Sequence, residues 1–226
     1  MSARSQYTVR DVARADAADY FDVLALADPD EPAPFAPSRH MLAAQGYPAF
    51  PQGEALAVIA RDRAGNPAGA LLAGTPAWLL HHPATSGDLA LLTALGSRLS
   101  MVHGLAVHPD HNGHGLGGRL LRHAEHRLAR AGFGMSTLIH PPHLERYYTR
   151  LGYTSAAQLL VNLPTGLAGQ IFEGARAATK PLDPRVRLTH VPGAPAPIIT
   201  GLLADTRIHP EASFADGVLH EPRTRT

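Results

Sequence analysis

The stretch HGLAVHPDHNGHGLGGRLL, residues 103–121, limits the fold of this 226-residue chain more than any other segment. Glycines at 113, 115, 117 and 118 stand between an apolar run that ends at Val107 and a run with helical spacing. Glycine lets the backbone turn sharply, but glycines at a helix start lower the stability of that helix. We therefore expect a buried strand over residues 100–107, a tight turn, and a helix over residues 117–133.

The neighbouring segments place this turn in a sheet. Residues 135–140, MSTLIH, form a second apolar run of strand length, so strand, helix and strand follow one another. This order predicts a right-handed crossover between neighbouring parallel strands. Residues 54–78 hold two apolar runs separated by DRAGN, which predicts an antiparallel hairpin. With further strands expected at 7–12 and 158–164, the sequence predicts a mixed α/β sheet.

Other segments show helical spacing of their apolar residues or the composition of a loop. The six prolines of residues 28–53 indicate a loop. Further helices are expected at 13–27, 86–99, 142–152 and 198–206, and a further strand at 186–190.

Composition excludes several classes of protein. Charged residues are 17% of the chain and the formal net charge is +1, which gives no electrostatic reason to bind nucleic acid or an anionic membrane. The chain has no cysteine, so disulfides, thiolate nucleophiles and cysteine-ligated zinc are excluded. No apolar run reaches the roughly 20 residues of a membrane span, and the first residues lack the apolar core of a signal peptide. We therefore expect a cytoplasmic protein.

The glycine turn has the chemistry of an anion site. Exposed backbone N–H groups and the positive end of the helix dipole meet there, which suits phosphate. A nucleotide P-loop would need Lys and then Ser or Thr after the glycines, but the chain has GGR at 117–119. Gly113, Gly115 and Gly118 match the dinucleotide spacing, yet the acid expected about 20 residues later is missing. Two interpretations remain: a turn that binds nothing, and the pyrophosphate site of an acyl-CoA enzyme.

The residues of the turn resemble a known family. LAVHPDHNGHGLGGRLL is similar to the GNAT superfamily of N-acetyltransferases, whose signature (Q/R)-x-x-G-x-(G/A) follows a strand ending in L-x-V-x-P. The signature falls on residues 112–117, where Asn112 departs from the usual Gln or Arg. YYTRLGY, residues 147–153, resembles a second segment of that family. The resemblance covers residues 5–163 as a GNAT-like acyl-CoA-dependent transferase domain and leaves residues 164–226 as a C-terminal extension, which would be a lid, a dimer contact or an added half-domain.

The resemblance implies a fold and a cosubstrate. The fold is a mostly antiparallel twisted sheet with a central parallel strand pair and flanking helices. The cosubstrate is acetyl-CoA, held by strand backbone and by the glycine turn. In that family the proline-rich segment 28–53 would form the wall of the acceptor site. DPDE at 28–31 would attract a cationic amine there, and the alternative is a solvated turn. The residues expected to bind acetyl-CoA are Leu105, Ala106, Val107, Asn112, Gly113, His114, Gly115, Leu116, Gly117, Gly118 and Arg119.

Two side chains are candidates for proton transfer. Because side chains alternate along a strand, His103 is expected on the same face as Leu105 and Val107, and an imidazole suits removal of a proton from an amine near neutral pH. HGLAVH is similar to the H-x-L-A-V-H of serotonin N-acetyltransferase, where this histidine serves in proton removal. That enzyme has a second histidine two residues earlier, where this chain has Met101. The resemblance assigns Tyr148 to the leaving thiol. The alternatives are a core histidine at 103 and aromatic packing at 148.

These observations predict an N-acetyltransferase that moves an acetyl group from acetyl-CoA to the primary amine of a small molecule, by direct attack in a ternary complex. Another acyl donor on the same scaffold, such as a different acyl-CoA or an aminoacyl-tRNA, and a non-catalytic acyl-CoA-binding regulator stay open. We expect no membrane or nucleic-acid partner and leave a homodimer open. No metal site is expected, because His108, His111 and His114 fall in the turn and His123 and His126 lack a third ligand.

Overall fold

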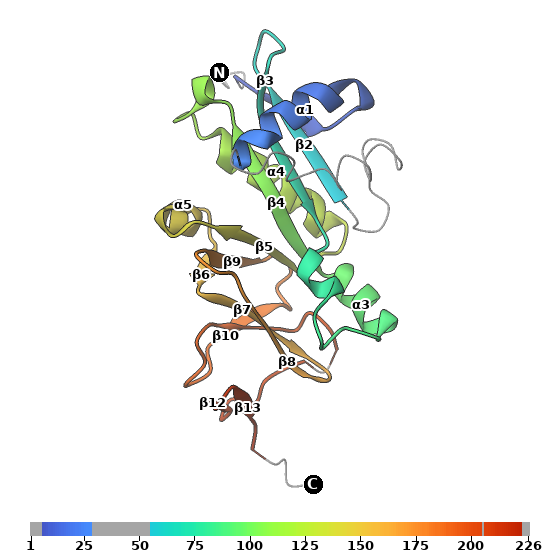
Figure 1. The fold of residues 1–226 in the computed structure, drawn as a ribbon, viewed down its shortest axis with the longest axis vertical. Coiled ribbons are helices and arrows are strands. Elements are labelled where there is room, and N and C mark those ends of the chain that lie inside the picture. Colours follow the sequence, from blue (N-terminus) through green and yellow to red (C-terminus); the bar gives the residue numbers. More distant parts are fainter. Residues whose placement is uncertain (1–5, 29–54, 205, 223–226) are drawn as a thin grey trace. The chain divides into compact units, whose positions relative to one another are not determined.

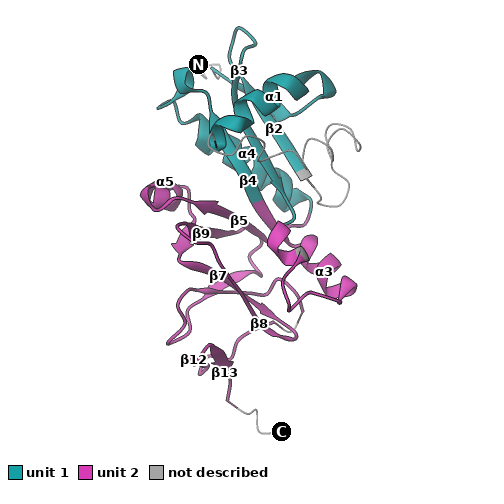
Figure 2. Ribbon diagram, viewed as in Figure 1, with its two compact units in different colours: residues 1–75, 102–131 teal, residues 76–101, 132–226 magenta. Residues whose placement is uncertain are grey.

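The structure, a computed structural model, describes residues 6–28, 55–204 and 206–222 (Figure 1). The chain divides into two compact units, shown in Figure 2: unit 1 comprises residues 1–75 and 102–131, and unit 2 comprises residues 76–101 and 132–226. Strand β4, Leu99–Val107, begins in unit 2 and continues into unit 1. The proline-rich segment 28–53 lies almost wholly outside the described residues.

Unit 1 contains a sheet in the order β1-β2-β3-β4. Its first three strands are β1 (Thr8–Asp11), β2 (Ala55–Arg61) and β3 (Pro67–Gly74). Both β1–β2 and β2–β3 are antiparallel, which confirms the hairpin predicted around DRAGN. In its turn, Gly65 has φ +90° and the Asp62 carboxylate accepts from the Asn66 N–H at 2.8 Å.

Helices cover both faces of this sheet within unit 1 (Figure 1). Helix α1 (Ala17–Leu24), between the short helices η1 (Arg14–Asp16) and η2 (Ala25–Ala27), packs through Tyr20 and Leu24 on a cluster that includes Ala70 of β3. Gly69, the residue directly before Ala70 in β3, faces the opposite side of the sheet. There it contacts helix α4 (Leu116–Arg130). Because both faces are covered, β2 and β3 are continuous apolar runs instead of alternating ones.

Gly69 sets how closely α4 approaches β3. A Cβ at this position would lie 2.9 Å from Cδ1 of Leu120, 3.2 Å from the carbonyl oxygen of Ala106 and 3.3 Å from Cδ2 of Leu116. Leu116 and Leu120 belong to the first turns of α4 and are fully buried. The missing side chain therefore allows the start of α4 to lie directly on the sheet.

Unit 2 continues the sheet order from β4 as β4-β5-β9-β6. The further strands are β5 (Met135–His140), β6 (Thr154–Ala156) and β9 (Arg176–Pro181). The Ser100 hydroxyl donates to the Met135 carbonyl at 3.0 Å and the Thr137 hydroxyl donates to the Ser100 carbonyl at 2.8 Å, so the first residues of β4 lie beside β5. β4 and β5 are the central parallel pair, joined through α4, while β5–β9 and β9–β6 are antiparallel. The predicted mixed fold is confirmed.

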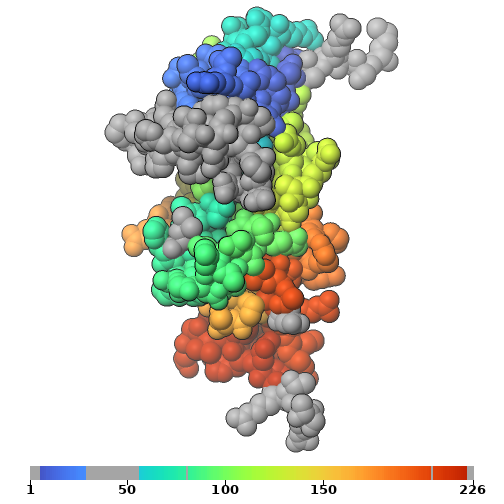
Figure 3. Space-filling model, turned by 90° about the vertical axis from the view of Figure 1, so that its right-hand side faces the viewer, coloured from blue at the N-terminus to red at the C-terminus, as the bar shows by residue number. Residues whose placement is uncertain are grey.

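A second sheet in unit 2 has the order β10-β11-β7-β8. Its strands are β7 (Gln158–Leu163), β8 (Gly166–Ile171), β10 (Arg187–Thr189) and β11 (Ile198–Thr200). The helix predicted over 198–206 is wrong, because residues 198–200 form β11, parallel to β7 and buried. Two isoleucines and a threonine favour a strand, and Gly201 at φ +76° ends it. The hairpin of β12 (Ser213–Ala215) and β13 (Val218–His220) follows, in the red part of the surface in Figure 3.

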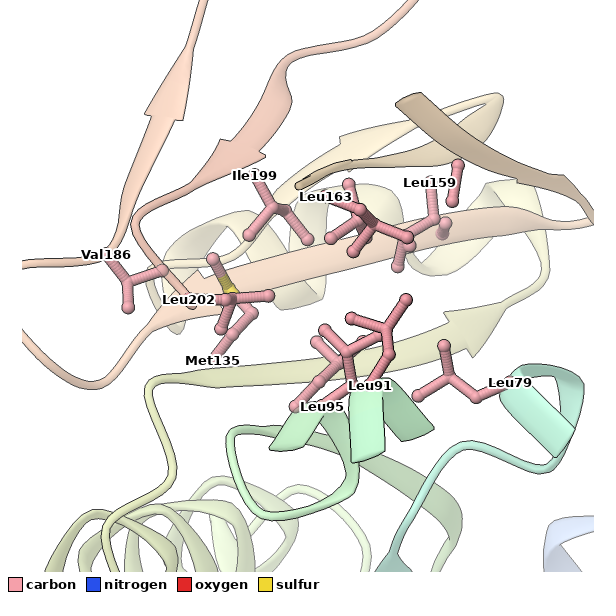
Figure 4. Packing of buried hydrophobic residues seen from close by; sticks show 13 residues of the cluster. Leu79, Leu91, Leu95, Met135, Leu159, Leu163, Val186, Ile199 and Leu202 are labelled. Carbon is pink, nitrogen blue, oxygen red and sulfur yellow. The ribbon is translucent and has the colours of Figure 1, made fainter. Parts of the chain in front are cut away.

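The core of unit 2 joins both of its sheets to helix α3 (Leu89–Gly96) (Figure 4). Leu91 and Leu95 of this helix pack in one cluster with Met135 of β5 and Leu159 of β7. The N-cap of α3 is Asp88, whose side chain accepts from the Leu91 N–H at 2.8 Å. The helix therefore begins later than residue 86, where the sequence predicted its start.

The remaining short elements are η3 (Ala77–Leu80), η4 (Pro109–His111), η5 (Pro142–Leu144) and α5 (Glu145–Arg150). Strand β9 comes after residue 163, the expected end of the transferase domain, yet lies between β5 and β6. The division into 5–163 and 164–226 stays a prediction. None of the described helices is long and apolar enough to cross a membrane.

We predict that Gly69→Ala lowers the free energy of unfolding by about 1–3 kcal/mol, because its Cβ overlaps Leu120 and the Ala106 carbonyl. Urea unfolding followed by circular dichroism measures this. Leu120→Val in the Gly69→Ala background should cost at least about 0.5 kcal/mol less than in the wild type, since it relieves part of the overlap. Additive losses in the double variant would contradict the close approach.

Candidate functional site

The chain between β4 and α4 turns through two glycines in the left-handed region. After η4, residues Asn112 to Gly115 are exposed, and Gly113 and Gly115 have φ of +79° and +70°. Side chains rarely adopt these angles, so the turn requires glycine at both positions. Gly115 is the N-cap of α4, and Leu116, Gly117 and Gly118 are buried in its first turn. The predicted turn and helix start are confirmed within one residue.

The backbone N–H groups of this turn remain available to a ligand. From Gly113 to Gly118 they donate to no residue in the described part of the chain, and the first intrahelical bond runs from the Arg119 N–H to the Gly115 carbonyl at 3.2 Å. A Cβ added at Gly113 or Gly115 would meet nothing within 4 Å, so the space beside the turn is open. These N–H groups lie at the positive end of a 15-residue helix, where they suit a phosphate anion.

Side chains around the turn hold it against the start of β1. The Tyr7 hydroxyl lies 3.2 Å from Nδ1 of His111, and Nη2 of Arg119 donates to the Tyr7 carbonyl at 3.2 Å. The Arg119 guanidinium also lies 6.0 Å from the centre of the Tyr7 ring. Arg119, expected to bind acetyl-CoA, is thus partly engaged within the protein. Sequence reasoning missed Tyr7, because no local pattern indicates a contact across 104 residues.

The histidines of this region have structural partners of their own. His108 caps η4, its Nδ1 accepting from the Asp110 N–H at 3.4 Å. His123 of α4 has Nε2 3.5 Å from the Asp11 carboxylate, which also pairs with Arg127, so these residues tie α4 to β1. Among the described residues, no group of three or more His, Cys, Asp or Glu side chains is placed to hold a metal ion.

His103 lies in β4 with its side chain exposed, and Nε2 is 3.2 Å from the Thr75 carbonyl oxygen. Because a carbonyl only accepts, Nε2 carries the proton and Nδ1 of the neutral ring keeps a lone pair. Although the ring reaches solvent, surrounding protein atoms remove part of its water and lower the pKa of His103 below 6.5, while the bond to Thr75 opposes this. His103 is therefore neutral at pH 7 and able to accept a proton at Nδ1.

The strand residues beyond His103 alternate as expected. Leu105 and Val107 are half-buried on the face of His103, whereas Ala106 is 5% exposed and packs with the α1 cluster on the other face. All three belong to unit 1, together with His103 and the glycine turn. The structure thus brings the strand candidates and the turn into one unit.

Tyr148 belongs to unit 2, where it lies on α5 and is 8% exposed. Its ring packs against Tyr147 and His140, with centroids 5.0 Å and 4.9 Å away. Burial raises the pKa of Tyr148 to about 12, and Tyr147 adds to the rise. Its hydroxyl makes no hydrogen bond to another described side chain or carbonyl. The phenol therefore stays protonated at all physiological pH values and has a proton to donate.

His140, which the sequence analysis missed, holds the ring next to Tyr148. It is 1% exposed at the end of β5, with Nδ1 2.8 Å from the Pro141 carbonyl and Nε2 2.9 Å from the Ser155 hydroxyl. The carbonyl fixes the proton on Nδ1, so Nε2 accepts from Ser155. Both ring nitrogens are bonded, which locks the imidazole against which Tyr148 packs. The available signal was a histidine at the end of a predicted strand, seven residues before the tyrosine pair at 147 and 148.

Comparison with known proteins matches residues 59–155 to a family model described as an acetyltransferase (GNAT) domain. A search of curated protein sequences found no match. Among solved structures, the GNAT family N-acetyltransferase YhbS from Escherichia coli, in complex with CoA, has a TM-score of 0.54 and 17% identity over 88% of this chain and 91% of that chain. The ribosomal-protein-S18-alanine N-acetyltransferase from Escherichia coli has a TM-score of 0.50 and 16% identity over 78% of this chain and 94% of that chain. At such identities the likeness to these structures shows the fold.

We predict that Gly115→Ala weakens the affinity for coenzyme A about tenfold, because an alanine at φ +70° costs roughly 1–2 kcal/mol and the turn would rearrange to relieve it. Isothermal titration calorimetry measures the affinity. Gly87→Ala is the matched control, since Gly87 has φ +85° and equally open surroundings but lies outside the turn. Equal coenzyme A affinities of the two variants would contradict a role for this backbone in binding.

Proposed function

Because the chain belongs to the GNAT acetyltransferase family, we propose that it transfers the acetyl group of acetyl-CoA to the primary amine of a small molecule by direct attack in a ternary complex. The observation that carries this proposal is the row of N–H groups from Gly113 to Gly118, at the start of α4, which donate to no residue in the described ranges. No membrane or nucleic acid takes part in this reaction.

The donor would be held by backbone more than by side chains. The N–H groups of the glycine turn would bind the diphosphate of acetyl-CoA, with the exposed Asn112 side chain beside them. The main chain of Leu105, Ala106 and Val107 would bond to the pantetheine arm as an added strand does. Substitution of Asn for the family's Gln or Arg leaves this backbone site intact.

His103 would remove the amine proton. A lysine-like amine has a pKa near 10.4, so supplying its neutral form at pH 7 costs about 4–5 kcal/mol. The lone pair on Nδ1 of His103 is available for the proton, and the Thr75 carbonyl then stabilises the imidazolium through Nε2–H. The neutral amine nitrogen attacks the thioester carbonyl carbon and then releases its second proton to solvent. Collapse of the tetrahedral intermediate breaks the carbon–sulfur bond and leaves the amide.

Tyr148 would serve the departing sulfur. A thiol with a pKa near 8.5 is a better acid than a phenol with a pKa of about 12, so Tyr148 donates a hydrogen bond to the thiolate without becoming a phenolate. The thiolate finally takes a proton from solvent. Without cysteine in the chain, a thioester acyl-enzyme cannot form, which favours direct attack.

The test is a thiol-release assay with acetyl-CoA and a panel of small primary amines, with the amide product identified by mass spectrometry. Amine-dependent release of thiol supports the proposal. Micromolar acetyl-CoA binding without turnover would favour a binding regulator instead, and turnover only with longer acyl-CoA donors or with aminoacyl-tRNA would overturn the acetyl donor. Absence of any acyl-CoA binding would overturn the whole proposal.

We predict an acid limb in the pH profile of kcat/KM with its midpoint below pH 6.5, because activity needs neutral His103 and is lost as pH falls through its lowered pKa. His103→Gln should abolish this limb and reduce kcat/KM by about 10²–10⁴-fold. His126→Gln, on the exposed face of α4, is the control and should keep the limb. A limb that persists in His103→Gln would assign it to another group.

We predict that Tyr148→Phe lowers kcat about 100-fold and leaves the dissociation constant of coenzyme A within about twofold, because only the hydroxyl is lost and the ring still packs on His140. Steady-state kinetics and calorimetry measure the two quantities. Tyr147→Phe is the matched control on the same helix and should retain activity. A loss of kcat that is equal in both variants would point to packing in place of a hydrogen bond to the thiolate.

A further inference from the structure

Unit 2 contains a pocket of about 760 Å³ that the proposed acetyl transfer does not use. Three arginines, Arg98, Arg185 and Arg207, line it together with residues Gly201–Ala204. We infer that this pocket binds the phosphate group of a small anionic molecule. The inference is independent of the proposed function.

The pocket lies at the opposite end of β5 from Tyr148. Arg98 immediately precedes β4, and its carbonyl accepts from the N–H groups of Gly134 and Met135, at the start of β5. Tyr148, in contrast, follows the carboxyl end of β5. Within unit 2, a phosphate in this pocket would therefore not compete for the space around Tyr148.

Arg98 fixes the walls of the pocket. Its guanidinium donates to the carbonyls of Gly132 at 2.5 Å and Leu202 at 3.3 Å, and it pairs with Asp183 at 3.1 Å. These bonds join three separate segments of unit 2. Arg98 therefore holds the pocket together, and direct contact with a ligand would come mainly from Arg185 and Arg207.

Glycine and apolar anchors hold the same segments in place. Gly201 has φ +76°, and a Cβ there would lie 2.3 Å from the Arg185 carbonyl oxygen, so the two segments meet at a point where only glycine fits. Their neighbours Val186 and Leu202 are buried in the core beside Met135 (Figure 4). The pocket walls are therefore anchored before any ligand arrives, which lowers the entropy lost on binding.

Among the residues that the structure describes, the charge around the pocket favours an anion. The carboxylate of Asp183 pairs with Arg185 and Arg98, which hold the pKa of Asp183 well below its usual range. The Arg185 side chain remains 77% exposed, and Arg207 is exposed with no ion pair or hydrogen bond to a residue that the structure describes. Among the described residues, the three guanidinium groups that line the pocket have one carboxylate near them, that of Asp183.

A phosphate monoester matches this arrangement. At pH 7 it carries a charge of about −1.5 to −2 and three acceptor oxygens. Guanidinium forks bind such oxygens through paired, charge-assisted hydrogen bonds. Arg207 would supply such a fork, and Arg185 would add a bond from Nη1, because its Nε and Nη2 already donate to Asp183. The phosphate could come as the free ion or as the ester of a small metabolite, and the two sources share this chemistry.

The test is an NMR titration of the full chain with inorganic phosphate and, separately, with glycerol 3-phosphate, following backbone amides and arginine Nε–H signals. We expect saturable shifts at residues 201–204 and at Arg185 and Arg207, weakening as salt is raised. Tighter binding of the ester would identify a phosphorylated metabolite as the source, and equal binding would identify the phosphate ion. The glycine turn of unit 1 also suits phosphate, and its amides at 113–118 report that site separately.

Variants decide the assignment. Arg207→Gln should weaken phosphate binding at residues 201–204 about tenfold, since a hydrogen bond to a charged group is worth about 1.5 kcal/mol or more. Arg185→Gln should act in the same direction, and neither side chain supports the core. Arg150→Gln, an exposed arginine on α5, is the matched control and should change nothing. Shifts confined to residues 113–118, or equal affinities of Arg207→Gln and Arg150→Gln, would overturn the inference.

Discussion

The close packing of α4 on β3 is the constraint on which the rest of unit 1 depends. Gly69 lets Leu116 and Leu120 reach the sheet, and this fixes where the first turn of α4 begins. Gly113 and Gly115 then reverse the chain at positive φ, so that the following N–H groups donate to no residue that the structure describes. A site made of backbone tolerates Asn112 in place of Gln or Arg, because the helix start carries the positive charge whatever side chain precedes it.

Burial prepares the two candidate proton-transfer groups in opposite directions. Loss of water disfavours the charged form of any group, so it lowers the pKa of His103, whose charged form is protonated, and raises that of Tyr148, whose charged form is not. Both groups are neutral at pH 7, so His103 is able to accept a proton and Tyr148 is able to donate a hydrogen bond. Neighbouring residues also fix the two side chains. The Thr75 carbonyl selects the tautomer of His103, and the His140 ring packs against the Tyr148 ring.

The C-terminal part of the chain, residues 164–226, supplies strands to both the larger and the smaller sheet. β9 completes the larger sheet between β5 and β6, and β11 inserts beside β7 in the smaller one. The loops that follow β9 and β11 bring Arg185 and Arg207 to Arg98, which precedes β4. A phosphate pocket at this place would be built from side chains, whereas the site proposed at the glycine turn is built from backbone.

The sequence alone determined the elements whose signals are local. The glycine turn, the β2–β3 hairpin, the crossover helix and the family resemblance all rest on residues close together in the chain, where turn chemistry and periodicity act directly. Only the tertiary structure decided contacts across long separations: Tyr7 with His111, Thr75 with His103, His140 with Tyr148, and the arginine pocket. It also turned residues 198–200 into a strand, because an apolar run of that length suits either element until a partner such as β7 satisfies its backbone hydrogen bonds.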